Sequence, residues 1–166
     1  MSMADTGIGA SVRRKEDHRF LTGKGHYTDD INRPGQAHAY FIRSPHAHAT
    51  IGKIDISKAE KAPGVVAIFT GKDLANAKVG SLICGWVVKS KDGSPHKAPP
   101  HLPLAVDKVR YVGDQVAVVI AETLAQAKDA AEQVVIDYKV LPANIDTAKS
   151  LDPKAPQIHA EAPGNL

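Results

Sequence analysis

The feature that most restricts the fold of this sequence is a pattern of strand, short helix and strand that occurs twice. In the first copy, alternating polar and apolar residues over 46–56 predict a strand, and a compact β-branched run at 65–69 predicts another. In the second copy, strands are predicted at 115–120 and 134–138. These units predict an α/β (α+β) domain with a mixed sheet and two short-to-medium helices.

Each copy carries a helix start signal between its strands. Ser57 and Glu60 have the spacing of a capping box, as do Thr123 and Gln126, in which each side chain satisfies a free backbone donor. The second helix is expected over 124–133, because its apolar residues recur on one face. Further strands are predicted at 37–43, 82–88, 104–106 and 109–112.

The length and composition fit one domain with loose ends. A chain of 166 residues with 43% hydrophobic content is long enough for one ordinary core. We expect residues 1–35 to form an extended arm and residues 36–145 to form the folded domain. Residues 146–166 contain three prolines and predict a connector that leads out of the domain.

Charge and hydropathy exclude several classes of partner. The 21 basic and 18 acidic residues are interspersed, so no nucleic-acid partner is expected. No apolar run is long enough to cross a bilayer, and residues 1–10 lack the basic start and apolar stretch of a secretory signal. The sequence therefore predicts a cytoplasmic protein without a membrane span.

A single cysteine, Cys84, lies among mostly apolar neighbours and has no second cysteine to pair with. We interpret it as a buried strand residue. A reactive thiolate would need nearby positive charge to lower its pKa, and the sequence around Cys84 offers none.

Two imidazoles, those of His46 and His48, share one face of a predicted strand and could contribute to a metal site. Such a site needs three or four ligands, so we favour polar histidines on the outer face of a half-exposed strand. The remaining histidines lie in probable loops without ligand spacing: His18, His26, His38, His96, His101 and His159.

Two Thr-Gly-Lys sequences, at 22–25 and 70–73, resemble parts of phosphate loops. Both lack the earlier glycine and the Ser or Thr after the lysine, so we interpret them as turns. Gly7-Ile8-Gly9 does not predict a dinucleotide site, because no strand precedes it.

Candidates for acid–base or nucleophilic chemistry are equally incomplete. Glu16-Asp17 and Asp29-Asp30 are adjacent carboxylates in an extended arm, where we expect surface or capping roles. Ser44 and His46 lack a third member and a Gly-flanked elbow. From the residues alone, no catalytic, cofactor-binding or metal-binding residue is assigned.

Five segments of the chain carry a family resemblance, in an order and spacing that cover nearly its whole length. They are residues 13–31, 43–49, 63–65, 109–114 and 138–143. They resemble successive landmarks of the molybdenum-hydroxylase large subunits, the family of carbon monoxide dehydrogenases, aldehyde oxidases and xanthine dehydrogenases. The chain resembles their N-terminal α/β-hammerhead domain, and its arm is most similar to the carbon monoxide dehydrogenase large chain.

The resemblance implies an oxidoreductase in which a molybdopterin cofactor reacts with substrate, and 2Fe-2S clusters and FAD in partner subunits or domains carry the electrons. Catalytic and molybdopterin-binding residues are then expected in domains after this one, so that this chain alone binds no cofactor and is inactive. The connector at 146–166 is expected to lead to the missing molybdopterin-binding domain. The expected partners are the molybdopterin-binding domains and the iron–sulphur and flavin subunits.

Three matters stay open at this point. The complete enzyme could oxidise carbon monoxide, an aldehyde or an N-heterocycle, and the chain could be a shortened product or a natural chain that needs a partner. Two alternatives are not enzyme components: a binding module that uses His46, His48 and Lys72 on a sealed surface, and a structural adaptor. An enzyme component instead predicts an unsatisfied apolar surface on the isolated domain.

Overall fold

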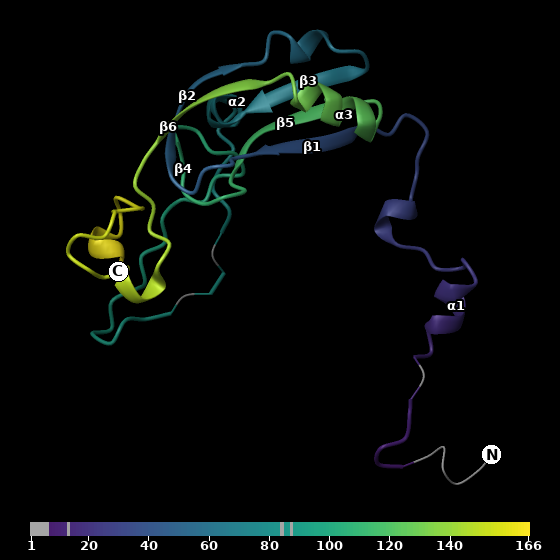
Figure 1. Ribbon diagram of the computed structural model, residues 1–166, viewed down its shortest axis with the longest axis horizontal. Helices are drawn as coiled ribbons and strands as arrows, with labels where there is room; N and C mark the ends of the chain where they lie inside the picture. The colour runs from purple at the N-terminus through teal and green to yellow at the C-terminus, as the bar shows by residue number, and fades with distance from the viewer. Residues whose placement is uncertain (1–6, 13, 84, 87) are drawn as a thin grey trace. The chain divides into compact units, whose positions relative to one another are not determined.

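The computed structural model describes residues 7–12, 14–83, 85, 86 and 88–166, which fall into two units, Met1–Gln36 and Ala37–Leu166 (Figure 1). The first unit contains α1 (Asp17–Leu21) and the 3-10 helix η2 (Thr28–Asp30). Neither helix buries a residue. The rings of Phe20 and Tyr27 stack with their centroids 5.3 Å apart, so the contacts of this unit are local.

The second unit consists of two three-stranded sheets with short helices. Sheet A has the strand order β1-β5-β3 and sheet B the order β4-β2-β6, and every pair of neighbouring strands is antiparallel. The strands are β1 (His38–Arg43), β2 (Ala49–Asp55), β3 (Val65–Thr70), β4 (Lys108–Val109), β5 (Gln115–Ala121) and β6 (Val135–Val140). The helices are η3 (Ala59–Lys61), α2 (Gly71–Asn76), α3 (Leu124–Ala131), η4 (Thr147–Lys149) and η5 (Pro163–Asn165).

Both predicted strand–helix–strand units are present, and each of them crosses between the sheets. The first runs from β2 in sheet B through η3 to β3 in sheet A, and the second runs from β5 in sheet A through α3 to β6 in sheet B. The predicted α/β (α+β) class is confirmed. The strands expected in a mixed sheet lie in two antiparallel sheets, because each helical segment carries the chain from one sheet to the other.

Two apolar clusters hold this unit together. One lies between α3 and sheet A, where Ile68 and Val119 pack against alanines of α3 that are fully buried, Ala127 and Ala130. Figure 1 shows α3 lying against this sheet. The other cluster joins sheet B to the start of β5 through residues that are almost fully buried: Ala49, Ala105, Val109 and Val116.

The two predicted capping boxes have different outcomes. At Thr123 the cap is confirmed, since the Gln126 backbone N–H donates to Thr123 Oγ1 at 3.2 Å, but Gln126 Oε1 accepts from the Thr123 hydroxyl at 2.8 Å in place of the Thr123 backbone N–H that a capping box predicts. The box at Ser57 is wrong, because the N-cap is Lys58, one residue later, and the Ser57 hydroxyl turns back to donate to Asp55 Oδ1 at 2.7 Å. The first helix is accordingly reduced to the single 3-10 turn η3.

The structure differs from the sequence predictions at one helix and in the strands expected over 82–112. Residues 70–73, interpreted as a turn, start α2, where Asp73 Oδ2 accepts from the backbone N–H of Thr70 at 2.7 Å. The strands expected at 104–106 and 109–112 are reduced to β4. Over 82–88, the described residues form only a bridge from Leu82 to His101. Within the described part of the chain, no helix has the length and apolarity to cross a membrane.

The first prediction concerns Gly71, which packs against the backbone of residues 104–105. A Cβ added at Gly71 would collide with the Ala105 carbonyl and lie 3.0 Å from the Leu104 carbonyl oxygen. Gly71→Ala should therefore lower the free energy of unfolding by about 1–3 kcal/mol in urea denaturation. Gly80→Ala is the control, since a Cβ there meets nothing within 4 Å, and an equal loss in both variants would contradict the packing account.

The second prediction concerns acid sensitivity. Hydrogen bonds from Thr70 lower the pKa of Asp73, so the ionised carboxylate stabilises the native state. That contribution is present above the unfolded-state pKa of about 3.9 and is lost as the pH falls through the lower folded-state value. Asp73→Asn should therefore lose less stability than the unchanged chain between about pH 6 and about pH 3. Asp129→Asn, on the exposed face of α3, should behave like the unchanged chain, and identical pH profiles for all three would refute the assignment.

Candidate functional site

Two irregular segments, residues 43–48 and 109–114, meet where β1 ends and β5 begins. The backbone N–H of Ser44 donates to the Asp114 carbonyl, and the N–H of Gly113 donates to the Ser44 carbonyl, both at 2.8 Å. Arg43 Nη1 adds a hydrogen bond to the Gly113 carbonyl at 2.9 Å. Residues about 70 positions apart in the chain are thereby fixed to one another.

Asp114 is a buried carboxylate that organises the loop before β5. Its side chain is 7% exposed and accepts a hydrogen bond from the backbone N–H of Arg110 at 3.0 Å. Gly113 has φ +91°, a conformation that glycine adopts without steric cost. Burial, followed by the nearby Asp114 carboxylate, raises the pKa of Tyr111. A buried carboxyl group is thus held by the chain's own backbone.

The two histidines that suggested a metal site have separate roles. His48 is 5% exposed, and its Nδ1 lies 2.7 Å from the Pro142 carbonyl oxygen. Because a carbonyl only accepts, Nδ1 carries the hydrogen of this bond, and the described residues offer no hydrogen-bond partner to the buried Nε2. The ring of His46 contacts the edge of Tyr138, with centroids 5.1 Å apart. The expectation of outer-face histidines is therefore wrong for His48, whose hydrogen bond to Pro142 permits burial.

No third ligand joins these imidazoles. Across the residues that the structure describes, no group of three or more His, Cys, Asp or Glu side chains is arranged to hold a metal ion. Ser44 is 2% exposed and its Oγ bonds to the backbone of His46, donating to the carbonyl at 2.9 Å and accepting from the N–H at 3.0 Å. The hydroxyl therefore does not pair with the imidazole of His46 as a nucleophile pairs with a base.

In both candidate phosphate loops, backbone N–H groups donate to acceptors of the chain itself. Gly23 has φ +69°, and the Lys24 N–H donates to the Arg19 carbonyl at 2.8 Å, so the turn interpretation of 22–25 is confirmed. At 70–73, Asp73 occupies the helix start and Lys72 is exposed. None of the hydrogen bonds or ion pairs among the described residues links Lys72 to His46 or His48.

The remaining sequence candidates have local roles or lie outside the structure. Asp30 Oδ2 accepts from the Tyr27 N–H at 2.8 Å, which confirms the expected capping role. Glu16 and Asp17 lie at the start of α1. Cys84 lies outside the described residues, so its interpretation stays a prediction.

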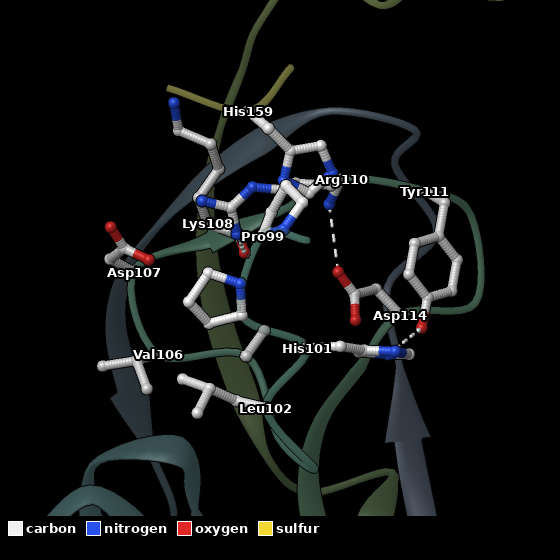
Figure 2. A pocket seen from close by; sticks show the side chains of 12 residues that line it. Pro99, His101, Leu102, Val106, Asp107, Lys108, Arg110, Tyr111, Asp114 and His159 are labelled. Atoms are coloured by element: carbon white, nitrogen blue, oxygen red, sulfur yellow. Dashed lines mark hydrogen bonds between the residues drawn. The ribbon is translucent and has the colours of Figure 1, made fainter. Parts of the chain in front are cut away.

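A cavity of about 280 Å³ lies beside this junction, and Figure 2 shows its polar side chains converging. Arg110 and Lys108 come from the segment around β4, and His159 comes from the segment between η4 and η5. The Nε2 of His101 lies 3.3 Å from the Tyr111 hydroxyl. Burial and, next, the Arg110 charge lower the pKa of His159, so the cavity disfavours a further positive charge.

A second feature is the face of sheet A that points away from α3. Ile42 and Val119 pack toward α3, so Phe41, Val118 and Phe69, which alternate with residues of that face, point to the opposite side. These three residues are in register across β1, β5 and β3. Phe41 is 41% and Phe69 40% exposed, and Val118 between them is half-buried, so two large apolar rings of this row remain exposed. We call these three residues the open face.

Sequence reasoning missed the site residues Arg110 and Asp114. Both lie in the 109–114 segment that carried part of the resemblance, but no role was assigned to them. The available signal was a pair of opposite charges four residues apart, Arg110 and Asp114, beside Gly113. The hydrogen bond from the Arg110 backbone N–H to the Asp114 side chain, and the cavity beside it, become visible only when the chain is folded.

Comparisons with known proteins agree with this architecture. Residues 22–142 match the family model described as "Aldehyde oxidase and xanthine dehydrogenase, a/b hammerhead domain". The nicotine 6-hydroxylase large subunit of Paenarthrobacter nicotinovorans is 40% identical over 96% of this chain and 19% of its own length. The carbon monoxide dehydrogenase large chain of Afipia carboxidovorans is 38% identical over 93% of this chain and 18% of its own.

A solved structure is similar over most of the chain. Quinoline 2-oxidoreductase from Pseudomonas putida 86 superposes with a TM-score of 0.75 at 36% identity, covering 89% of this chain and 18% of that one. The chain therefore spans under a fifth of the length of these relatives. Because the family model covers most of the chain, this protein belongs to the aldehyde oxidase and xanthine dehydrogenase α/β-hammerhead domain family.

Proposed function

We propose that this chain is the non-catalytic N-terminal domain of a molybdopterin-dependent oxidoreductase large subunit and that it docks on the rest of that subunit. The observation that carries the proposal is the open face, formed by Phe41, Val118 and Phe69. Monomeric proteins seldom leave a row of large apolar side chains uncovered on a sheet. The relatives have about four-fifths of their length outside the matched region, which is enough protein to cover it.

The residues of this chain do not fit the cofactor itself. At 22–25, the backbone N–H groups of Thr22, Gly23 and Lys24 donate to carbonyls of the chain itself. At 70–73, the carboxylate of Asp73 accepts from the Thr70 N–H and so occupies the start of α2. The proposal therefore assigns molybdopterin to the rest of the subunit, and 2Fe-2S clusters and FAD to partner subunits or domains. The compartment proposed is the cytoplasm.

The substrate of the complete enzyme is assigned to the rest of the subunit as well. The relatives include a carbon monoxide dehydrogenase, a nicotine 6-hydroxylase and a quinoline 2-oxidoreductase, with similar identities to this chain. Because this domain is similarly conserved in enzymes that act on different substrates, we assign it a role in assembly of the subunit and not in substrate selection. Carbon monoxide, an aldehyde or an N-heterocycle would be selected elsewhere in the subunit.

The third prediction tests docking through the open face. Phe69→Asp places a charge within the open face, so binding to the molybdopterin-binding part of the large subunit should weaken by at least about tenfold in titration calorimetry. Val140→Asp is the matched control, because Val140 is a 63% exposed apolar residue on sheet B. Equal losses in both variants, or none in either, would contradict docking through this face.

The fourth prediction concerns activity. The 166-residue chain alone should carry no stoichiometric molybdenum and should not oxidise carbon monoxide, aldehydes or N-heterocycles with an artificial dye as acceptor. Its complex with the molybdopterin-binding part should contain molybdenum by elemental analysis and should turn over one of these substrates. Turnover by the isolated chain would overturn the non-catalytic assignment, and a complex without molybdenum would overturn the enzyme assignment.

A further inference from the structure

We propose that the cavity beside sheet B binds a single carboxylate group through the guanidinium of Arg110. This site is separate from the open face and is not needed for docking through it. The ligand chemistry is that of an Asp or Glu side chain from the rest of the subunit or of a small free carboxylate. Either source presents the same two oxygens to Arg110.

The guanidinium of Arg110 forms no ion pair with a carboxylate of the described residues. Its side chain is half-buried, and its Nε is buried without a hydrogen-bond partner among the described residues. Nη1 reaches only the Lys108 carbonyl, at a long 3.4 Å. Of the ion pairs that the described residues form within 4.0 Å, none includes Arg110. A partly buried guanidinium of this kind is stabilised strongly by an incoming anion.

The two carboxylates that line the cavity do not fill this role. The side chain of Asp114 accepts from the backbone N–H of Arg110 and lies beside Tyr111, as Figure 2 shows. Asp107 is exposed to solvent and makes no ion pair among the described residues. The guanidinium itself is therefore left to a ligand that the folded chain does not contain.

The surroundings of Arg110 favour a carboxylate over a larger anion. A guanidinium presents a planar fork of donors that matches the two oxygens of a carboxylate. Lys108 and His159 also line the cavity and add donors, while Pro99 and Leu102 form an apolar wall. A volume of about 280 Å³ accommodates a side chain or a small acid and is too small for a dinucleotide.

The test is a titration of the isotope-labelled 166-residue chain with sodium acetate at constant ionic strength, with sodium chloride as the comparison salt. Acetate should shift the NMR signals of His101 and His159 in a saturable manner, and chloride should not. Arg110→Gln should weaken acetate binding at least tenfold, and Arg110→Lys should weaken it less, because the charge remains but the fork is lost. Lys72→Gln, at an exposed lysine outside the cavity, should bind like the unchanged chain.

The spectrum of each variant shows whether it is folded, and the titration of His159 gives a readout that does not need the Gln variant. Burial and Arg110 lower the pKa of His159, so saturating acetate should raise it toward its ordinary value in the unchanged chain. The proposal fails if acetate gives no saturable shift, or if Arg110→Gln is folded and binds acetate with unchanged affinity.

Repeating the titration in the complex with the rest of the subunit distinguishes the two sources. If a side chain fills the cavity, the pKa of His159 is already raised in the complex and acetate no longer binds. If the ligand is a free acid, acetate binds in the complex as in the isolated chain. Both outcomes support the site, whereas an unshifted His159 that also ignores acetate in the complex overturns it. Docking through the open face is measured independently, so either proposal can fail alone.

Discussion

The structure depends on β5, the strand that both apolar clusters share. β5 pairs with β1 on one side and β3 on the other, so it is the centre of sheet A. Val119 points into the cluster with α3, and Val116 points into the cluster with sheet B, and both are fully buried. Burying a side chain of this size contributes about 1.5–3 kcal/mol, so one strand links the two cores energetically. β5 also begins directly after Asp114 of the polar junction, and it supplies Val118 to the open face.

Hydrophobic periodicity made the strands of this core predictable. The run at 115–120 is apolar from Val116 onward, and it forms β5 with one additional residue. The cap at Thr123 was also predictable, because the Thr-to-Gln spacing is local and the hydroxyl bonds to the backbone and side chain of Gln126. At Ser57 the same spacing failed, because the backbone N–H and the hydroxyl of Ser57 both turn back to Asp55 Oδ1, and η3 has Lys58 at its N-cap instead.

The division into two sheets and the cavity were beyond the sequence pattern. Alternation of polar and apolar residues predicts which side chains share a face of a strand. It does not predict which sheet the strand joins, and nothing in the patterns of β2 and β3 assigns them to different sheets. The Arg110 cavity needs His159, which is far away in the chain and lies in a segment interpreted only as a connector. The resemblance marked 109–114 and 138–143 as landmarks, and the structure gives the physical reason: their backbones fix Ser44 and His48.

The central claim is that the open face is covered in the complete large subunit. Hydroxyl-radical footprinting with mass spectrometry measures the exposure of Phe41 and Phe69 side chains directly, with Val140 as an internal reference on sheet B. The account predicts that Phe41 and Phe69 are oxidised in the isolated chain and are protected in the complete subunit, while Val140 changes less. Equal oxidation of the two phenylalanines in both forms would contradict it.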